Sequence, residues 1–310
     1  MRENDGVGLV IFPRIPNKIL FGMKSEIEIF RIISAFGIVW FHSGIEYGRD
    51  IAYGGLIFFI IISVYFSITS TRVHTFTERA QRLILPYIIW QVFYGVVKIA
   101  TKGAAFLHDS SMLSVFFVGA ALHLWFLPFI FFVLIAIDKL HFLLLKKAWL
   151  ATLIGILAML SILFSPLWRG FDYPLPLGQY MHAMPAVFIG IFLGACTEFK
   201  IKLALMIGII LSMLLMVFTK QPGIGVPYLT GFIPCCFLFT GYLKTNQKPL
   251  LQYVAAATFG VYLLHPFALK IMKYVGVVGF FLPTGAFFLS FLAILIFRTH
   301  MPKNIVKYFI

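Results

Sequence analysis

The chain is a succession of long apolar segments separated by short polar connections. A helix that spans a membrane needs about 20 mostly apolar residues. Segments of this kind lie near residues 28–46, 54–70, 83–100, 122–138, 148–166, 182–197, 203–219, 226–243, 250–270 and 277–297, and residues 105–120 are the most ambiguous stretch. With 61% of the 310 residues hydrophobic and 12% charged, the chain has too little polar surface to coat a soluble globule. We therefore expect an all-α polytopic membrane protein with about ten transmembrane helices.

The basic residues indicate how such a protein is oriented. The net charge is +14, and most Lys and Arg side chains fall on the connections that share a side with the amino terminus. Cytoplasmic loops of membrane proteins carry this excess, so we expect both termini in the cytoplasm and no nucleic-acid partner. The predicted organisation is a cytoplasmic segment over residues 1–27, a transmembrane domain over 28–297 that contacts the lipid bilayer, and a cytoplasmic tail over 298–310.

The first predicted span contains ionisable residues, which are costly in a membrane and usually face an internal cavity. Arg31 and His42 are eleven residues apart, which corresponds to three helical turns plus about 20° and an axial separation of about 16 Å. Glu28 and Glu46 fall within about 60° of the same face. This face is expected to line a cavity that runs inward from the cytoplasmic side.

The residue types on this face suit acyl transfer. Histidine is the side chain whose unperturbed pKa lies near neutrality, as a general base needs, and Glu46 could hold the tautomer of His42. Arg31 offers a planar positive group for phosphate or developing negative charge, and Glu28 could orient it. An internal ion-pair network that fixes the first helix in the bundle explains the same residues, and both interpretations stay open.

Two other classes of function remain as alternatives. A secondary transporter or lipid-linked sugar flippase could use Arg31, His42 and Glu46 for coupling. Transporters often contain inverted repeats, and no second segment repeats the spacing of the first span. A partner-binding membrane scaffold is the third reading.

Four motifs in sequence order resemble the acyltransferase-3 family of bacterial membrane proteins. They are the Arg31 and His42 pair, "RAQRLILPYIIW" with Arg79 and Arg82, "HLWFLPFIF" with His123 and Trp125, and "TFGVYLLHPF" with Tyr262 and His265. The resemblance covers nearly the whole chain. The second span, "YGGLIFFIIISVYFS", lacks the carboxylate that is usual in the family, which puts a role for this helix in question.

The resemblance implies an O-acyltransferase of the bacterial cytoplasmic membrane. It would move an acyl group, usually acetyl, from cytoplasmic acyl-CoA to an extracytoplasmic glycan or its lipid-linked precursor. The paired Arg and His of the family fall on Arg31 and His42. Arg79 and Arg82 are further candidates for binding the phosphates of the donor, although cytoplasmic placement alone explains them too. Direct transfer and an acyl-histidine intermediate both remain open.

The remaining motif residues are candidates for the acceptor side. His265, Tyr262, His123 and Trp125 could contact the acceptor; a packing role for His265 and an interfacial role for Trp125 are equally compatible with the sequence. No histidine has the spacing of a metal ligand, so we predict no metal and no permanently bound cofactor. Whether the chain forms homo-oligomers stays open.

Overall fold

The structure is a computed structural model that describes residues 24–103, 112–240 and 249–309. These residues form helices and connections, with no strand among them. In chain order the elements are α2 (Lys24–Ser43), α3 (Arg49–Thr69), α4 (Phe76–Arg79), a π-helical turn (Ala80–Ile84), α5 (Leu85–Lys102), α6 (Met112–Phe117), a 3-10 turn (Leu122–Trp125), α7 (Phe126–Lys146), α8 (Ala148–Leu163), α9 (Ser165–Arg169), α10 (Leu177–Ala195), α11 (Phe199–Phe218), α12 (Gly225–Thr240), α13 (Pro249–Ala255), α14 (Thr258–Tyr274), α15 (Phe281–His300) and α16 (Lys303–Phe309). The prediction of an all-α polytopic membrane protein is confirmed.

A helix occupies the position of each predicted span, but not all of them qualify as spans on their own. Six helical segments in the described part of the chain are long and apolar enough to cross a membrane: Arg49–Thr69, Phe76–Thr101, Leu122–Lys146, Leu177–Ala195, Phe199–Phe218 and Phe281–His300. Helix α2 carries several charges, and α8, α12 and α14 have only 16 or 17 residues in the described part. The count of ten spans and the orientation of the termini therefore remain predictions.

Two predicted spans differ in detail from the structure. The segment predicted over 250–270 is broken into α13 and α14 by a turn at Ala256 and Ala257. The first span was expected to continue to residue 46, but α2 ends at Ser43. Gly44 has a φ of 88°, the left-handed conformation that commonly terminates a helix and that glycine adopts without steric cost.

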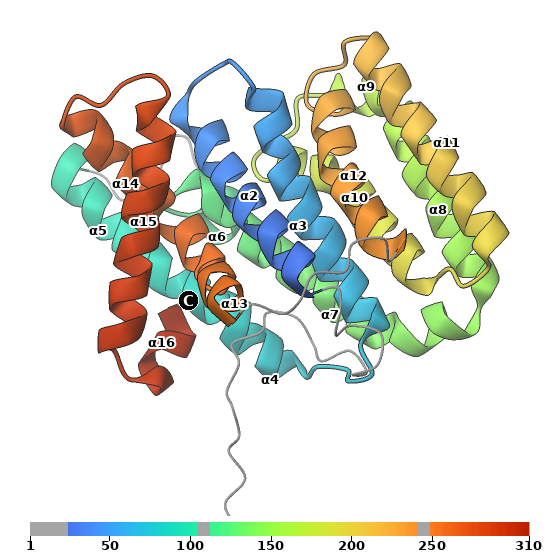
Figure 1. Ribbon diagram of the computed structural model, residues 1–310, viewed down its shortest axis with the longest axis horizontal. Coiled ribbons are helices and arrows are strands. Elements are labelled where there is room, and N and C mark those ends of the chain that lie inside the picture. Colours follow the sequence, from blue (N-terminus) through green and yellow to red (C-terminus); the bar gives the residue numbers. More distant parts are fainter. Residues whose placement is uncertain (1–23, 104–111, 241–248, 310) are drawn as a thin grey trace, which may run out of the picture.

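Helix α3 lies at the centre of the bundle, packed against α2, α10 and α12 (Figure 1). Close packing depends on Gly54 and Gly55. A Cβ atom on Gly55 would overlap the backbone of Ser34 in α2, and one on Gly54 would overlap Thr230 in α12. Small residues allow membrane helices to approach this closely, so the second predicted span has a structural role even without the family's carboxylate.

The bundle has two distinct ends. At one of them α2 begins, α3 and α7 end, and α4 lies across the helix termini (Figure 1). We call this the basic end, because Arg79, Arg82, Lys139 and Lys146 lie there. At the opposite end α2 connects to α3, and α9 leads into α10.

Candidate active site

Arg31 lies in α2, about two turns from the basic end, and forms an ion pair within its own helix. Its guanidinium donates to the carboxylate of Glu28, with Nη1 to Oε2 at 2.7 Å. Arg31 is buried, with 4% of its surface exposed, and Glu28 is partly buried. The pair lies one helical turn apart, which is the spacing at which side chains on one face meet.

His42 lies at the other end of the same helix, on the exposed surface of the bundle. Its imidazole packs against the imidazole of His265 from α14, with ring centroids 5.1 Å apart. The ring of His265 also packs against His123, at 5.3 Å. Residues from α2, α14 and the 3-10 turn before α7 thus form one group, the histidine cluster, and Tyr262 and Tyr94 pack beside it.

The backbone of α14 explains why two of these histidines are held so firmly. Pro266 has no N–H, so the carbonyl of Tyr262, four residues earlier, lacks its usual helical donor. The Nδ1 atom of His265 lies 2.6 Å from that carbonyl oxygen. The next carbonyl, that of Leu263, accepts a hydrogen bond from the Tyr94 hydroxyl at 2.7 Å and lies 3.3 Å from Nε2 of His123.

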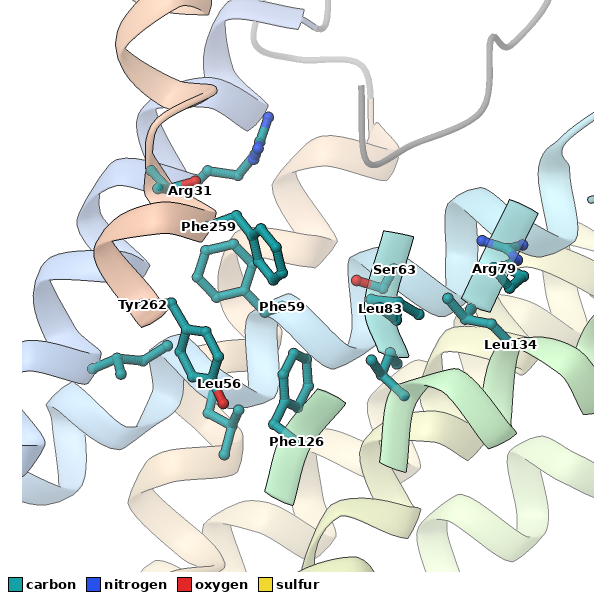
Figure 2. Close-up of a pocket in the computed structure, with 13 residues that line it drawn as sticks. Arg31, Leu56, Phe59, Ser63, Arg79, Leu83, Phe126, Leu134, Phe259 and Tyr262 are labelled. Atoms are coloured by element: carbon teal, nitrogen blue, oxygen red, sulfur yellow. The ribbon is translucent and has the colours of Figure 1, made fainter. Parts of the chain in front are cut away.

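A cavity extends from the basic end toward this cluster. It has a volume of about 720 Å³, including the part that is open to solvent. Figure 2 shows Arg31 on one side of the cavity, above the rings of Phe259, Phe59 and Tyr262, and Arg79 on the other side beside Ser63 and Leu83. The other walls are almost entirely apolar and come from Ile38, Leu56, Ser63, Leu83, Phe126, Ile130, Leu134 and Thr258. Tyr262 belongs to both sites, since it lines the cavity and packs against His265.

Arg79 is also buried, and its charge is balanced by a residue that sequence analysis missed. Its Nε and Nη2 atoms donate to the two carboxylate oxygens of Asp138 in α7, at 2.8 and 3.1 Å. Nη2 also donates to the hydroxyl of Ser67 at the end of α3, at 2.8 Å. Asp138 is the single carboxylate in the apolar run "LIAIDKLHF", and this pattern could have indicated a buried ionic partner.

Comparison with known proteins places this arrangement in a family. The acyltransferase-3 family profile, which describes an acyltransferase domain, matches residues 24–298 of the chain. The chain belongs to the acyltransferase-3 family. No curated protein and no solved structure gave a match. The resemblance seen in four sequence motifs is thereby confirmed, and the chain is a membrane acyltransferase.

In this acyltransferase the structure does not place Glu46 where the sequence suggested. The geometry assumed a helix that continued past His42, but α2 ends at Ser43 and Glu46 lies exposed in the following turn. Its backbone carbonyl accepts from the N–H of Arg49. The expectation that Glu46 shares a helical face with His42 is wrong, and the group that packs on His42 is instead His265.

Arg82 and Trp125 also occupy surroundings that the sequence did not determine. Arg82 is exposed at the basic end and does not line the cavity, although it is only three residues from Arg79. Trp125 of the acyltransferase is buried, and its ring packs against Phe129 and Tyr180. Trp125 therefore packs inside the bundle, and Arg82 lies with the other basic side chains of the basic end.

A second group of aromatic residues lies beside His42 at the opposite end. Phe41 packs against Tyr53, at 4.5 Å between ring centroids, and Tyr53 packs against His182, at 5.2 Å. Nδ1 of His182 lies 3.5 Å from the guanidinium of Arg169. Nothing in the linear sequence indicates that α3 and α10 bring the rings of Tyr53 and His182 together.

Among the described residues, no three His, Cys, Asp or Glu side chains are placed to hold a metal ion. The prediction that this acyltransferase needs no metal remains untested.

Proposed function

We propose that this acyltransferase is an O-acyltransferase of the bacterial cytoplasmic membrane. It moves an acyl group, most simply acetyl, from cytoplasmic acyl-CoA to a hydroxyl of an extracytoplasmic glycan or of its lipid-linked precursor. One observation carries the proposal: a cavity lined by Arg31 and Arg79 reaches Tyr262, and Tyr262 belongs to the group of rings that ends at the exposed His42.

The basic end suits the donor, because coenzyme A is polyanionic and cannot cross a bilayer. Arg31 lines the cavity and supplies a planar cation that can bind a phosphate of the donor. Arg82 is exposed on the same side and is available for the outer phosphates. Arg79 is a weaker candidate, because Asp138 already accepts from it through two hydrogen bonds. The apolar walls would accommodate the acyl group and its uncharged pantetheine arm.

The opposite end suits the acceptor. His42 is exposed there, and the rings of Phe41, Tyr53 and His182 extend the surface away from it. Sugars bind aromatic faces through their apolar C–H groups while their hydroxyls form hydrogen bonds. A glycan hydroxyl can therefore reach His42 from the side that the donor does not use.

The donor and the acceptor then meet at His42, where the acyl group is transferred. The acceptor oxygen attacks the thioester carbonyl while His42 takes its proton. The C–S bond breaks, the acyl group remains on the acceptor oxygen, and the coenzyme A thiolate leaves. The proton held by His42 finally passes to that sulfur, so one thioester and one hydroxyl give one ester and one thiol.

The test uses membranes that contain the full chain and the native acceptor. Vesicles are supplied with acetyl-CoA labelled in the acetyl group, and ester-linked label in the glycan fraction is measured with release of free thiol. In the wild type we expect labelled glycan and released thiol. In His42→Ala we expect the rate of acyl transfer to fall at least a hundredfold. His300→Ala is the matched control, because His300 is exposed and its hydrogen bonds in the described part of the chain are to Thr299 and Ile296 of α15.

Two outcomes would contradict the proposal. Undiminished transfer in His42→Ala would remove His42 from the chemistry. Movement of an unmodified glycan across the membrane, with no consumption of thioester, would instead favour the flippase alternative. Label that remains on the protein in the absence of acceptor would indicate an acyl-histidine intermediate in place of direct transfer.

A further inference from the structure

His265 is the one member of the histidine cluster with no exposed surface, and only one of its two nitrogens has a partner. Nδ1 lies 2.6 Å from the carbonyl oxygen of Tyr262. A carbonyl accepts but cannot donate, so the neutral imidazole carries its proton on Nδ1. Nε2 is then a lone-pair acceptor, and this buried atom has no hydrogen-bond partner among the residues that the structure describes. An unsatisfied buried acceptor is costly and calls for an explanation.

Two imidazoles pack against the ring of His265, and only that of His42 has a ring N–H that is not already directed at a backbone carbonyl. The Nε2 atom of His123 lies 3.3 Å from the carbonyl of Leu263, so its single proton in the neutral state is directed there. In the described part of the chain, no backbone carbonyl is hydrogen-bonded to the His42 ring, whose centroid lies 5.1 Å from that of His265. His42 is also exposed, which leaves its ring room to turn.

We propose that His265 is a positioning residue for His42: its Nε2 accepts a hydrogen bond from one ring nitrogen of His42, so that the other nitrogen faces the acceptor hydroxyl as a base. The inference rests on the proposed function and deepens it. Catalytic hydrogen bonds of this kind commonly shorten when substrate binds. His265 thus takes the place that the sequence had suggested for Glu46.

The pairing also gives the positive charge of the protonated base a partner. When His42 takes the hydroxyl proton, it becomes an imidazolium with two N–H donors, one of which remains bonded to His265. After the C–S bond breaks, the other N–H gives its proton to the thiolate, and both histidines are neutral again. No group outside the donor, the acceptor and these two side chains is required.

Few other ionisable groups face this pair. Arg49 of α3 lies over the ring of Phe41 beside His42, and α15 packs against this region through apolar side chains such as Leu282 and Phe287. The ring of His265 also contacts His123 of the 3-10 turn and Tyr262 of α14 itself, and Tyr94 of α5 packs on His123. None of these is a carboxylate that would serve as an alternative acceptor for His42.

Two substitutions separate positioning from packing, because they retain different nitrogens of the ring. His265→Asn places an amide near Nδ1, so it keeps the bond to the Tyr262 carbonyl but removes the acceptor at Nε2. His265→Gln places an amide near Nε2 and retains an acceptor there. We expect kcat/KM for acyl transfer to fall by about ten- to a hundredfold in His265→Asn and clearly less in His265→Gln. A purely structural histidine would give the reverse order.

The pH profile supplies a readout that a packing defect would not move. Loss of the acceptor at Nε2 destabilises protonated His42, so the acidic limb of kcat/KM should shift to lower pH, by about one pH unit, in His265→Asn. His300→Asn should leave the profile unchanged. A profile and rate like the wild type in His265→Asn, while His42→Ala is inactive, would overturn the inference and leave the proposed function intact. Transfer that survives His42→Ala would overturn both.

Discussion

The buried ion pair between Arg79 and Asp138 allows a quantitative test of how α4 is attached to the bundle. Both side chains are about 95% buried, and two hydrogen bonds of 2.8 and 3.1 Å join them. Replacement of Asp138 by Asn removes the negative charge but leaves the Arg79 guanidinium in the same surroundings. Removing one partner of a buried pair costs about 3–5 kcal/mol, because the remaining charge stays desolvated.

The bond to Ser67 persists in this variant, and the asparagine carbonyl still accepts one hydrogen bond from Arg79. We therefore expect the lower part of that range, about 3 kcal/mol of lost stability for Asp138→Asn. Asp138→Leu combined with Arg79→Met replaces the pair by apolar side chains of similar size, and most of the stability should return.

Unfolding of each variant is measured in detergent micelles in two ways. One is thermal aggregation, and the other is a denaturant titration. Adding the single variants Asp138→Leu and Arg79→Met to their double variant completes a cycle that measures the coupling between the two positions directly. A loss of less than about 1 kcal/mol in Asp138→Asn, or a double variant as unstable as the single one, would refute the assignment of a desolvated ion pair.

Three further outcomes follow from the site and the packing. Arg31→Lys keeps the charge but not the planar group, so we expect the KM for acyl-CoA to rise about three- to tenfold; an unchanged KM would make Arg31 a structural residue. Gly55→Ala introduces a Cβ that overlaps the backbone of Ser34, and thermal unfolding should reveal a loss of about 1–3 kcal/mol, whereas wild-type stability would refute the close contact of α2 and α3. Glu46→Gln should retain transfer within about twofold, since Glu46 is exposed beyond the end of α2; a large loss would restore its predicted role.

The helix positions and the side-chain contacts within one helix could be predicted from the sequence. Hydropathy located a helix at every predicted position because a membrane requires backbone polar groups to be satisfied within each helix. The contact of Glu28 with Arg31 depends only on helical spacing, and the structure contains it. The end of α2 was also encoded locally, by Gly44, but the apolar pattern around it concealed the signal.

Contacts between distant segments depend on the tertiary structure alone. Asp138 is 59 residues from Arg79, and His123 and His265 come from segments about 140 residues apart in the same region of the bundle. Each of these residues is an isolated polar position in an apolar run, so the sequence indicates that it has a partner without indicating which one. The sequence by itself therefore determined the class of protein, its family and the first helix with Arg31 and His42. Only helix packing decided that His265, and not Glu46, lies against His42, because that depends on how α2 and α14 meet and not on spacing within either helix.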